Sequence, residues 1–223
     1  TTLAAMIDLI NSNRSEHIIT IEDPIEFVHP NKSCLLNQRE VHNHTMSFKA
    51  ALRAALREDP DIVLVGEMRD LETTHIAIET AETGHLVFGT LHTTTAISTV
   101  DRLIDQFPAD QQQQIRTMLA GTLKGVVAQN LLKKKGGGRV AALEVMVVNH
   151  AVASLIREAK TNQIMSIMQT AKKEGMTLLN EELARFVKDD TVEPEEAWRK
   201  AVDKEGFMKA LESVGVNYKP PAE

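Results

Sequence analysis

The chain has 223 residues, of which 43% are hydrophobic and 25% charged, and its formal net charge is −6. This composition is ordinary for a globular protein, and the acidic balance excludes a global basic field that would attract nucleic acid. The single cysteine, Cys34, excludes an internal disulfide and a zinc site built from several cysteines. No apolar run reaches the ~20 residues that a membrane-spanning helix needs.

Helix and strand patterns alternate over the first half of the chain. Period-3.6 spacing of apolar residues marks the helices, and short β-branched runs mark the strands. The sequence predicts a helix over 3–13, strands over 17–21 and 35–40, a helix over 48–57, a strand over 62–66, a helix over 71–83, a strand over 85–91 and a helix over 95–107. This order is typical of an α/β fold in which helices flank a parallel or mixed sheet.

The second half is predicted to be mainly helical. The patterns predict a long helix over 110–132, a turn at 133–138, a strand over 139–148, and helices over 150–158, 161–173, 177–188, 194–203 and 205–213. We therefore expect a core over residues 1–148, a helical C-terminal subdomain over 149–218 and a disordered tail over 219–223.

Acidic residues follow two of the predicted strands. Glu22, Asp23 and Glu26 come directly after the strand that ends at Ile21, and Glu67 follows the apolar run that ends at Val65. Carboxylates at a strand's carboxyl end can hold magnesium-bound waters or deprotonate an attacking water. A solvated turn explains the first cluster as well, and taken alone that cluster favours the turn.

Histidines flank the strand predicted over 85–91. We interpret His85 as a hydrogen-bonded histidine near the core, whereas His92, at the carboxyl end, is better placed to meet a phosphate. His42 and His44 have no nearby acid at ligand spacing, which favours an exposed loop. The glycines at 136–138 lack the lysine, the hydroxyl residue and the helix of a phosphate-binding loop, and the 223 residues contain no such loop.

Three segments resemble the sequence boxes of the secretion ATPase superfamily, in that family's order. Residues 19–27 (ITIEDPIEF) resemble its Asp box, residues 59–70 (DPDIVLVGEMRD) its Walker B segment, and residues 83–93 (TGHLVFGTLHT) its His box. The resemblance extends over almost the whole chain. It implies a RecA-like core, ATP and Mg²⁺ as cofactors, and a hexameric homo-oligomer.

The resemblance also implies roles for individual residues. Glu26 would be the general base that orients the attacking water, with Glu22 in support, and Glu67 and Glu22 would hold Mg²⁺ through water. His92 would sense the γ-phosphate. The nucleotide-binding set implied in this way is Thr1, Thr2, Asp23, Glu67, Arg69 and His92.

Residues 1–8 resemble the segment just after the family's phosphate-binding loop. We therefore expect that loop, and an N-terminal domain, to lie upstream of Thr1. Because such a loop cradles phosphates with backbone amides and a lysine, we expect this chain alone to bind ATP weakly and to be inactive.

Two features favour a resemblance to the pilus-retraction branch of the superfamily. Extension and secretion members commonly carry a four-cysteine zinc module, which one cysteine cannot build. Residues 151–158 (AVASLIRE) resemble a helix motif of retraction ATPases, which implies that Leu155, Ile156, Arg157 and Glu158 couple to a partner. An ordinary amphipathic helix explains these residues equally well.

The family implies further partners and a location. Besides other copies of the chain, the expected partner is an inner-membrane platform protein, and the expected location is cytoplasmic and peripheral to the inner membrane. Three alternatives stay open: an accessory paralogue of the main retraction motor, an extension-type or DNA-uptake motor, and a catalytically silent fragment used for oligomerisation or docking.

Overall fold

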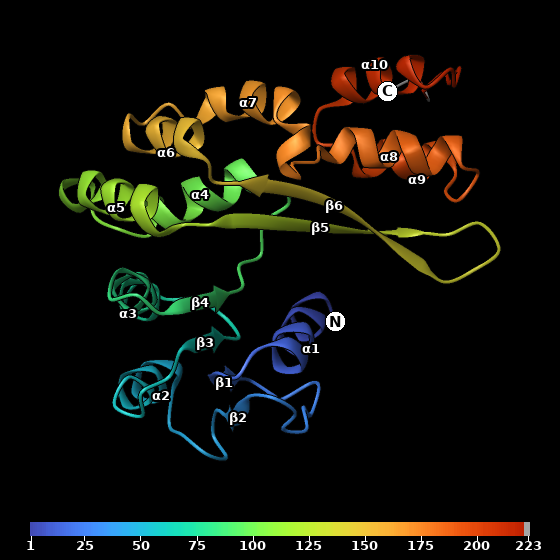
Figure 1. The fold of residues 1–223 in the computed structure, drawn as a ribbon. Helices are drawn as coiled ribbons and strands as arrows, with labels where there is room; N and C mark the ends of the chain where they lie inside the picture. Colours follow the sequence, from blue (N-terminus) through green and yellow to red (C-terminus); the bar gives the residue numbers. More distant parts are fainter. Residues whose placement is uncertain (221–223) are drawn as a thin grey trace. The chain divides into compact units, whose positions relative to one another are not determined.

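The computed structural model describes residues 1–220, which form two compact units (Figure 1). Unit 1 contains residues 1–92 and 106–108, and unit 2 contains residues 93–105 and the chain from 109 onward. The chain therefore passes between the units three times, after residues 92, 105 and 108.

These two units differ from the predicted core over 1–148 and helical subdomain over 149–218. That domain boundary stays a prediction for the complete protein. Residues 221–223, part of the predicted tail, lie outside the described residues.

Unit 1 is built on a four-stranded parallel sheet with strand order β2-β1-β3-β4. The strands are β1 (His17–Glu22), β2 (Leu35–Glu40), β3 (Ile62–Val65) and β4 (Leu86–Gly89). All four residues of β3 are buried, because this central strand has helices on both faces. The predicted α/β class is confirmed, and the sheet is parallel throughout.

Three helices cover this sheet: α1 (Thr2–Asn13), α2 (Phe48–Ala55) and α3 (Leu71–Glu82). On one face Ile7 of α1 packs with Ile18 and Leu64. On the other face α2 and α3 pack against the residues that alternate with these, among them Ile21 and Val63. The alternation of side chains along each strand thus supplies both cores.

Unit 2 contains an antiparallel pair of long strands and most of the helices. Its elements are α4 (Ala96–Asp105), α5 (Ala109–Thr122), β5 (Gly125–Lys133), β6 (Arg139–Val147), α6 (His150–Arg157), α7 (Ile164–Thr170), α8 (Leu179–Lys188), α9 (Pro194–Lys200) and α10 (Lys204–Ser213), with 3₁₀ turns η1 (Thr161–Gln163) and η2 (Lys172–Glu174). Leu132 and Ala142 of the strand pair share a core with side chains of α8 to α10.

The helix predicted over residues 110–132 is wrong in its second half. Helix α5 ends at Thr122, and residues 125–133 form β5, in which buried Val126 and Ala128 alternate with exposed Val127 and Gln129. Gly125 allows β5 to pair closely with β6, because a Cβ there would lie 2.9 Å from the Met146 carbonyl oxygen. Pairing with β6 therefore overrides the helical pattern.

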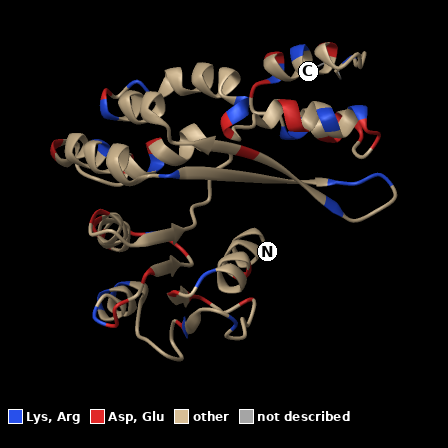
Figure 2. Cartoon of the chain, viewed as in Figure 1, with Lys and Arg blue, Asp and Glu red and all other residues tan. Residues whose placement is uncertain are grey.

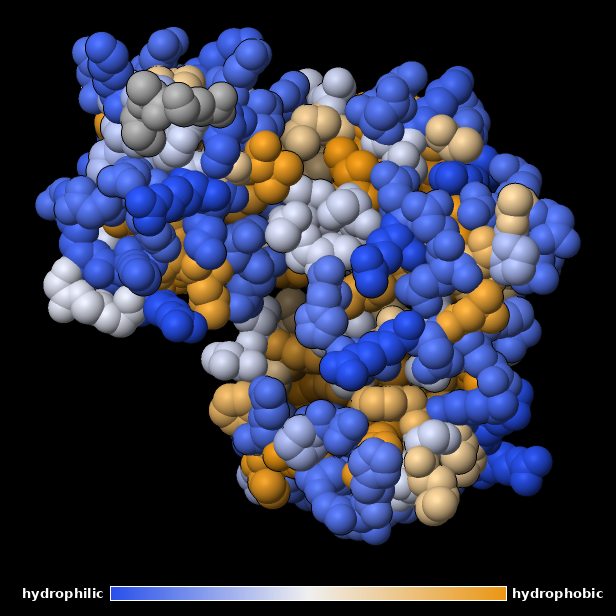
Figure 3. All heavy atoms as spheres, turned by 180° about the vertical axis from the view of Figure 1, so that it is seen from behind, coloured by the Kyte–Doolittle hydropathy of each residue, from blue (hydrophilic) through white to orange (hydrophobic). Residues whose placement is uncertain are grey.

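Charged and hydrophilic side chains lie on the outside of both units. The hairpin between β5 and β6 carries Lys133, Lys134 and Lys135, seen in blue in Figure 2, and Lys135 pairs with Asp190. Hydrophilic residues dominate the face shown in Figure 3. Among residues 1–220, no helix is long and apolar enough to cross a bilayer.

Candidate functional site

The carboxyl edge of the unit 1 sheet gathers several of the predicted site residues. Glu22 is the last residue of β1, Glu67 is the second residue after β3, and His92 is the third residue after β4. Because the strands are parallel, their carboxyl ends meet at one edge, which is where open α/β sheets bind ligands.

Glu67 is the most strongly held of these side chains. Its Oε1 lies 2.6 Å from Nε2 of His92 and also forms an ion pair with Nε of Arg69. The Glu67 side chain is only 16% exposed, whereas those of Arg69 and His92 are 76% and 79% exposed. The Arg69 hydrogen bond, with a further contribution from His92, lowers the pKa of Glu67, so this carboxylate stays ionised at neutral pH.

Backbone contacts fix the turn that presents Glu67. Gly66 N donates to the Ile21 carbonyl at 2.7 Å, and Met68 N donates to the Thr90 carbonyl at 3.1 Å. The Thr90 hydroxyl donates to the Gly66 carbonyl. A Cβ at Gly66 would lie 2.9 Å from Ile21 O, so the close approach of β3 to the end of β1 requires glycine.

Glu22 is positioned by polar neighbours on its own strand and on β2. Its Oε1 accepts hydrogen bonds from the Thr20 hydroxyl at 2.6 Å and from Gln38 Nε2 at 3.0 Å. Gln38 also donates to the Phe27 carbonyl at 2.8 Å and accepts from His29 N at 2.8 Å. Gln38 therefore ties the loop after β1 to Glu22, a role that the sequence analysis missed.

The other predicted nucleotide-site residues are less constrained. Asp23 and Glu26 are exposed in the loop after β1, and the Glu26 carboxylate has no partner among the described residues. Thr1 precedes α1, and Thr2 is its first residue. Since only three residues connect the end of α1 to β1, α1 runs back along the sheet with its amino end toward the carboxyl edge.

The predicted coupling residues lie on and just after α6 in unit 2. Ile156 is fully buried and Leu155 half-buried, whereas Arg157 and Glu158 are exposed. Glu158 accepts hydrogen bonds from Ser154 at 3.0 Å and Lys160 at 2.8 Å, and the Lys160 contact lowers its pKa. Helix α6 thus offers an apolar inner face and a charged outer end.

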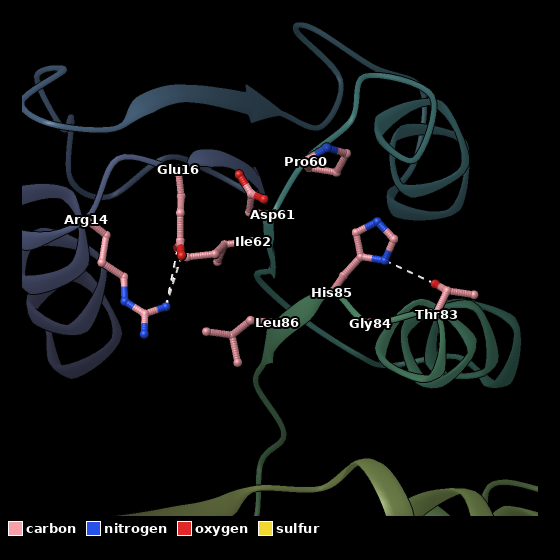
Figure 4. Close-up of a pocket in the computed structure, with 9 residues that line it drawn as sticks. All are labelled: Arg14, Glu16, Pro60, Asp61, Ile62, Thr83, Gly84, His85 and Leu86. Carbon is pink, nitrogen blue, oxygen red and sulfur yellow. Dashed lines mark hydrogen bonds and ion pairs between the residues drawn. The ribbon is translucent and has the colours of Figure 1, made fainter.

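A pocket of about 360 Å³ lies at the opposite, amino edge of the sheet (Figure 4). Ile62 and Leu86, the first residues of β3 and β4, line it beside an ion pair between Arg14 and Glu16. His85, also in the lining, contacts Thr80 O at 3.1 Å and Thr83 Oγ1 at 3.0 Å, in agreement with the interpretation of a hydrogen-bonded histidine. The pocket contains none of the predicted catalytic residues.

Comparison with known proteins identifies the family. The family model for type II/IV secretion system proteins matches residues 1–137. The chain belongs to this family.

Other members of the type II/IV secretion system protein family are closely similar. The chain is 55% identical over 207 residues to a type IV pilus retractation ATPase, PilT, of Pseudomonas aeruginosa, covering 93% of this chain and 60% of that protein. It is 55% identical over 208 residues to a twitching motility protein of Neisseria gonorrhoeae, covering 93% and 56%. The chain thus spans somewhat more than half the length of these relatives.

A solved structure shares the fold. The crystal structure of the pilus retraction motor PilT with bound ADP matches with a TM-score of 0.88 and 51% identity, over 94% of this chain and 59% of that one. The chain is therefore a homologue of the retraction ATPase PilT, and the expected resemblance to the retraction branch is confirmed.

Proposed function

We propose that the protein is a motor ATPase that hydrolyses ATP to power the retraction of type IV pili. One observation carries the proposal: the Glu67 carboxylate, just after β3, lies 2.6 Å from Nε2 of His92, just after β4, in a chain 55% identical to a retraction ATPase. An acid held at the tip of a buried strand, beside a group able to sense phosphate, is suited to phosphoryl-transfer chemistry.

The acidic residues at this edge suit Mg²⁺ bound through water. Glu67 and Glu22, at the carboxyl ends of the adjacent strands β3 and β1, offer carboxylate oxygens, the donors that Mg²⁺ prefers. Within residues 1–220 no group of three or more metal-ligating side chains gathers, which suits an ion held by one or two carboxylates and the nucleotide's phosphates. Bound there, the ion would neutralise charge on the phosphates.

Glu26 is the proposed general base. Its carboxylate is exposed and unpaired among the described residues, so it is free to accept a proton from a water. Asp23, Arg69, Thr1 and Thr2 complete the proposed nucleotide-binding set. Gln38, which holds the loop after β1, would limit the positions that Glu26 can reach.

The protein is proposed to act as a homohexamer. Its proposed partner is an inner-membrane platform protein, and its proposed location is the cytoplasmic side of that membrane. Arg157 and Glu158 at the exposed end of α6 are the proposed coupling residues.

Two glutamine variants in the complete protein test the ATPase function. Glu67→Gln and Glu26→Gln should each lower turnover by about 10² to 10⁴-fold while the melting temperature stays close to that of the parent, because each removes one charged group without changing shape. Glu16→Gln, at the amino edge, is the matched control and should hydrolyse ATP normally. Steady-state hydrolysis within threefold of the parent in either variant would contradict the role proposed for that residue.

Deletion of the gene distinguishes retraction from extension. Loss of twitching with pili still assembled on the cell supports the retraction motor, whereas loss of pili supports an extension motor. A protein that has a phosphate-binding loop but shows no ATP hydrolysis would point instead to a docking role.

A further inference from the structure

A buried carboxylate lies in unit 2, outside the proposed catalytic set. Glu144 of β6 is 2% exposed and is paired in register with Ala128 of β5. Burial raises the pKa of Glu144 despite its two backbone hydrogen bonds, so the site imposes a cost on the charged form. An acidic residue kept in such a place needs a reason beyond packing.

Glu144 joins the amino ends of two helices. Its Oε1 accepts the Ala96 N–H, the first of α4, at 2.7 Å, and its Oε2 accepts the Leu179 N–H, the first of α8, at 3.3 Å. First-turn N–H groups have no partner within their own helix. Leu178, which precedes α8, has no side chain able to accept, so Glu144 is the acceptor for that end.

The amino end of α4 is also tied to β5. Asn130 Nδ2 donates to the Thr94 carbonyl at 3.2 Å, two residues from the Glu144 contact. Thr95 and Ser98 cap the start of α4 reciprocally, because the backbone N–H of each donates to the hydroxyl of the other at 3.2 Å. The segment from Thr93 to Ala96 is therefore held on the strand pair rather than free.

The order of the chain links α4 to unit 1 on both sides. Helix α4 is the one described element of unit 2 that lies between two stretches of unit 1 in the chain, since unit 1 includes residues up to His92 and again 106–108. Gln106, just after α4, accepts a hydrogen bond from Thr74 of α3 at 2.9 Å. A displacement of His92 must therefore reach α4 through three residues of backbone.

We propose that Glu144 is a positioning residue that passes displacement of the segment after His92 to α8, and through α8 to the C-terminal helices. The inference rests on the proposed function, because it takes nucleotide at His92 as the source of the displacement. The link is short, since one carboxylate accepts hydrogen bonds from both helix ends, and α8 shares its core with α9 and α10.

Amide hydrogen exchange in the complete protein, with and without ADP, tests this link. In the parent protein ADP should slow exchange in both α4 and α8. In Glu144→Gln the amide group offers one acceptor and places a donor against the other N–H, so the response of α8 should fall about 3- to 10-fold while that of α4 remains. Leu179→Pro is a second variant, because proline is accepted at a first helical position but has no N–H. Leu179→Ala, which keeps the N–H, controls for loss of the buried leucine side chain.

Asp203→Ala is the matched control. Asp203 caps α10 through Gly206 N at 3.0 Å, so loss of its carboxylate weakens a helix end in the same core. The one contact of Asp203 with α8 that the hydrogen bonds show, from Asn180 Nδ2 to the Asp203 carbonyl at 2.9 Å, uses the backbone and is kept in the variant. The ADP response of α8 should survive in this variant.

An unchanged α8 response in Glu144→Gln or Leu179→Pro overturns the proposal, as does a parent protein whose α4 responds to ADP while α8 does not. These outcomes leave the proposed ATPase untouched. A parent protein that neither hydrolyses ATP nor responds to ADP in α4 overturns both.

Discussion

Individual residues at the carboxyl edge of the sheet set both the geometry and the charge of the candidate site. Gly66 allows β3 to approach β1, and Arg69 and His92 hold the Glu67 carboxylate. Gly66 acts through the space that its missing side chain leaves, whereas Arg69 and His92 act through charge. The two effects can therefore be tested by separate substitutions.

Gly66→Ala should destabilise the protein. The added Cβ would lie 2.9 Å from Ile21 O and 3.2 Å from Glu22 Cα, both backbone atoms that cannot rotate away. Overpacking of this kind costs about 1–3 kcal/mol in the free energy of unfolding, measurable by urea denaturation. Gly121→Ala, in α5 with nothing within 4 Å, is the control and should be neutral or slightly stabilising. Equal free energies of unfolding for Gly66→Ala and Gly121→Ala would show that the approach of β3 to β1 does not require glycine at position 66.

Arg69→Gln should raise the pKa of Glu67 toward its ordinary value of about 4.5. A carboxyl group whose folded pKa is lowered stabilises the fold above its unfolded pKa, and that contribution is lost as the pH falls through the folded pKa. Without Arg69 the acid loss of stability should begin at higher pH. The shift should be modest, because Arg69 is 76% exposed.

A carbon-13 titration of the Glu67 carboxyl measures this pKa directly. Arg53→Gln removes an exposed ion pair with Glu72 and no contact of Glu67, so it should leave the Glu67 pKa unchanged. A Glu67 pKa that is the same in Arg69→Gln and the parent would show that the ion pair is not the cause.

At the level of elements, the β-branched and apolar runs were enough to predict the strands of unit 1. The run at 62–65 became a fully buried central strand, as its composition indicates. The predicted helix was wrong over residues 125–133 for a physical reason. Val126 and Val127 favour a strand only once β6 is present to pair with them. Such a partner lies beyond any local window of the sequence.

The candidate site was predictable in part. A strand's end is visible in sequence, so Glu22, Glu67 and His92 could be placed at one edge. The contacts that hold them could not, since Gln38 and Glu144 meet their partners through pairings between distant segments. For Glu144 the available signal is a charged residue within the otherwise apolar run 140–147, whereas Gln38 lies among other polar residues of β2 and gives no such signal.

Helix α6 carries the prediction for force coupling. Arg157→Ala combined with Glu158→Ala in the complete protein should leave ATP hydrolysis and hexamer formation near normal but impair twitching. Both side chains are exposed, so their loss should change stability by no more than about 0.5 kcal/mol. Twitching assays at matched expression, with hydrolysis measured in parallel, check this.

Ile156→Ala is an unsuitable substitute for that pair, because truncating a fully buried isoleucine costs about 2–5 kcal/mol and confuses unfolding with uncoupling. Normal twitching in the double variant would leave α6 with a packing role alone.

For the whole molecule, the three passages between units make unit 1 depend on residues 106–108. Phe107 is 3% exposed and its ring meets His75 of α3 edge-on at 6.0 Å. The short return segment therefore packs on helix α3 of unit 1, whose other residues precede residue 93.

Phe107→Ala should destabilise unit 1 by about 3–5 kcal/mol, since it leaves a large cavity beside α3. Residue-resolved hydrogen exchange should show the loss of protection in β3 and β4 before α8 to α10. Phe27→Ala, with a ring 44% exposed, is the control and should have a much smaller effect. Equal loss of protection throughout the chain would mean that the units unfold as one.

The same three passages limit how genes for such proteins can exchange parts. A single genetic crossover at residue 92 would join one parent's residues 1–92 to the other parent's Gln106–Pro108 within unit 1, and a crossover at 108 would give unit 2 an α4 from the other parent. Neither hybrid inherits an intact unit from each parent. A crossover at 92 separates His75 from Phe107, and one at 108 separates Ala96 from Glu144. Hybrid proteins should therefore fold mainly when the two parents have the same residues at His75, Phe107 and Glu144.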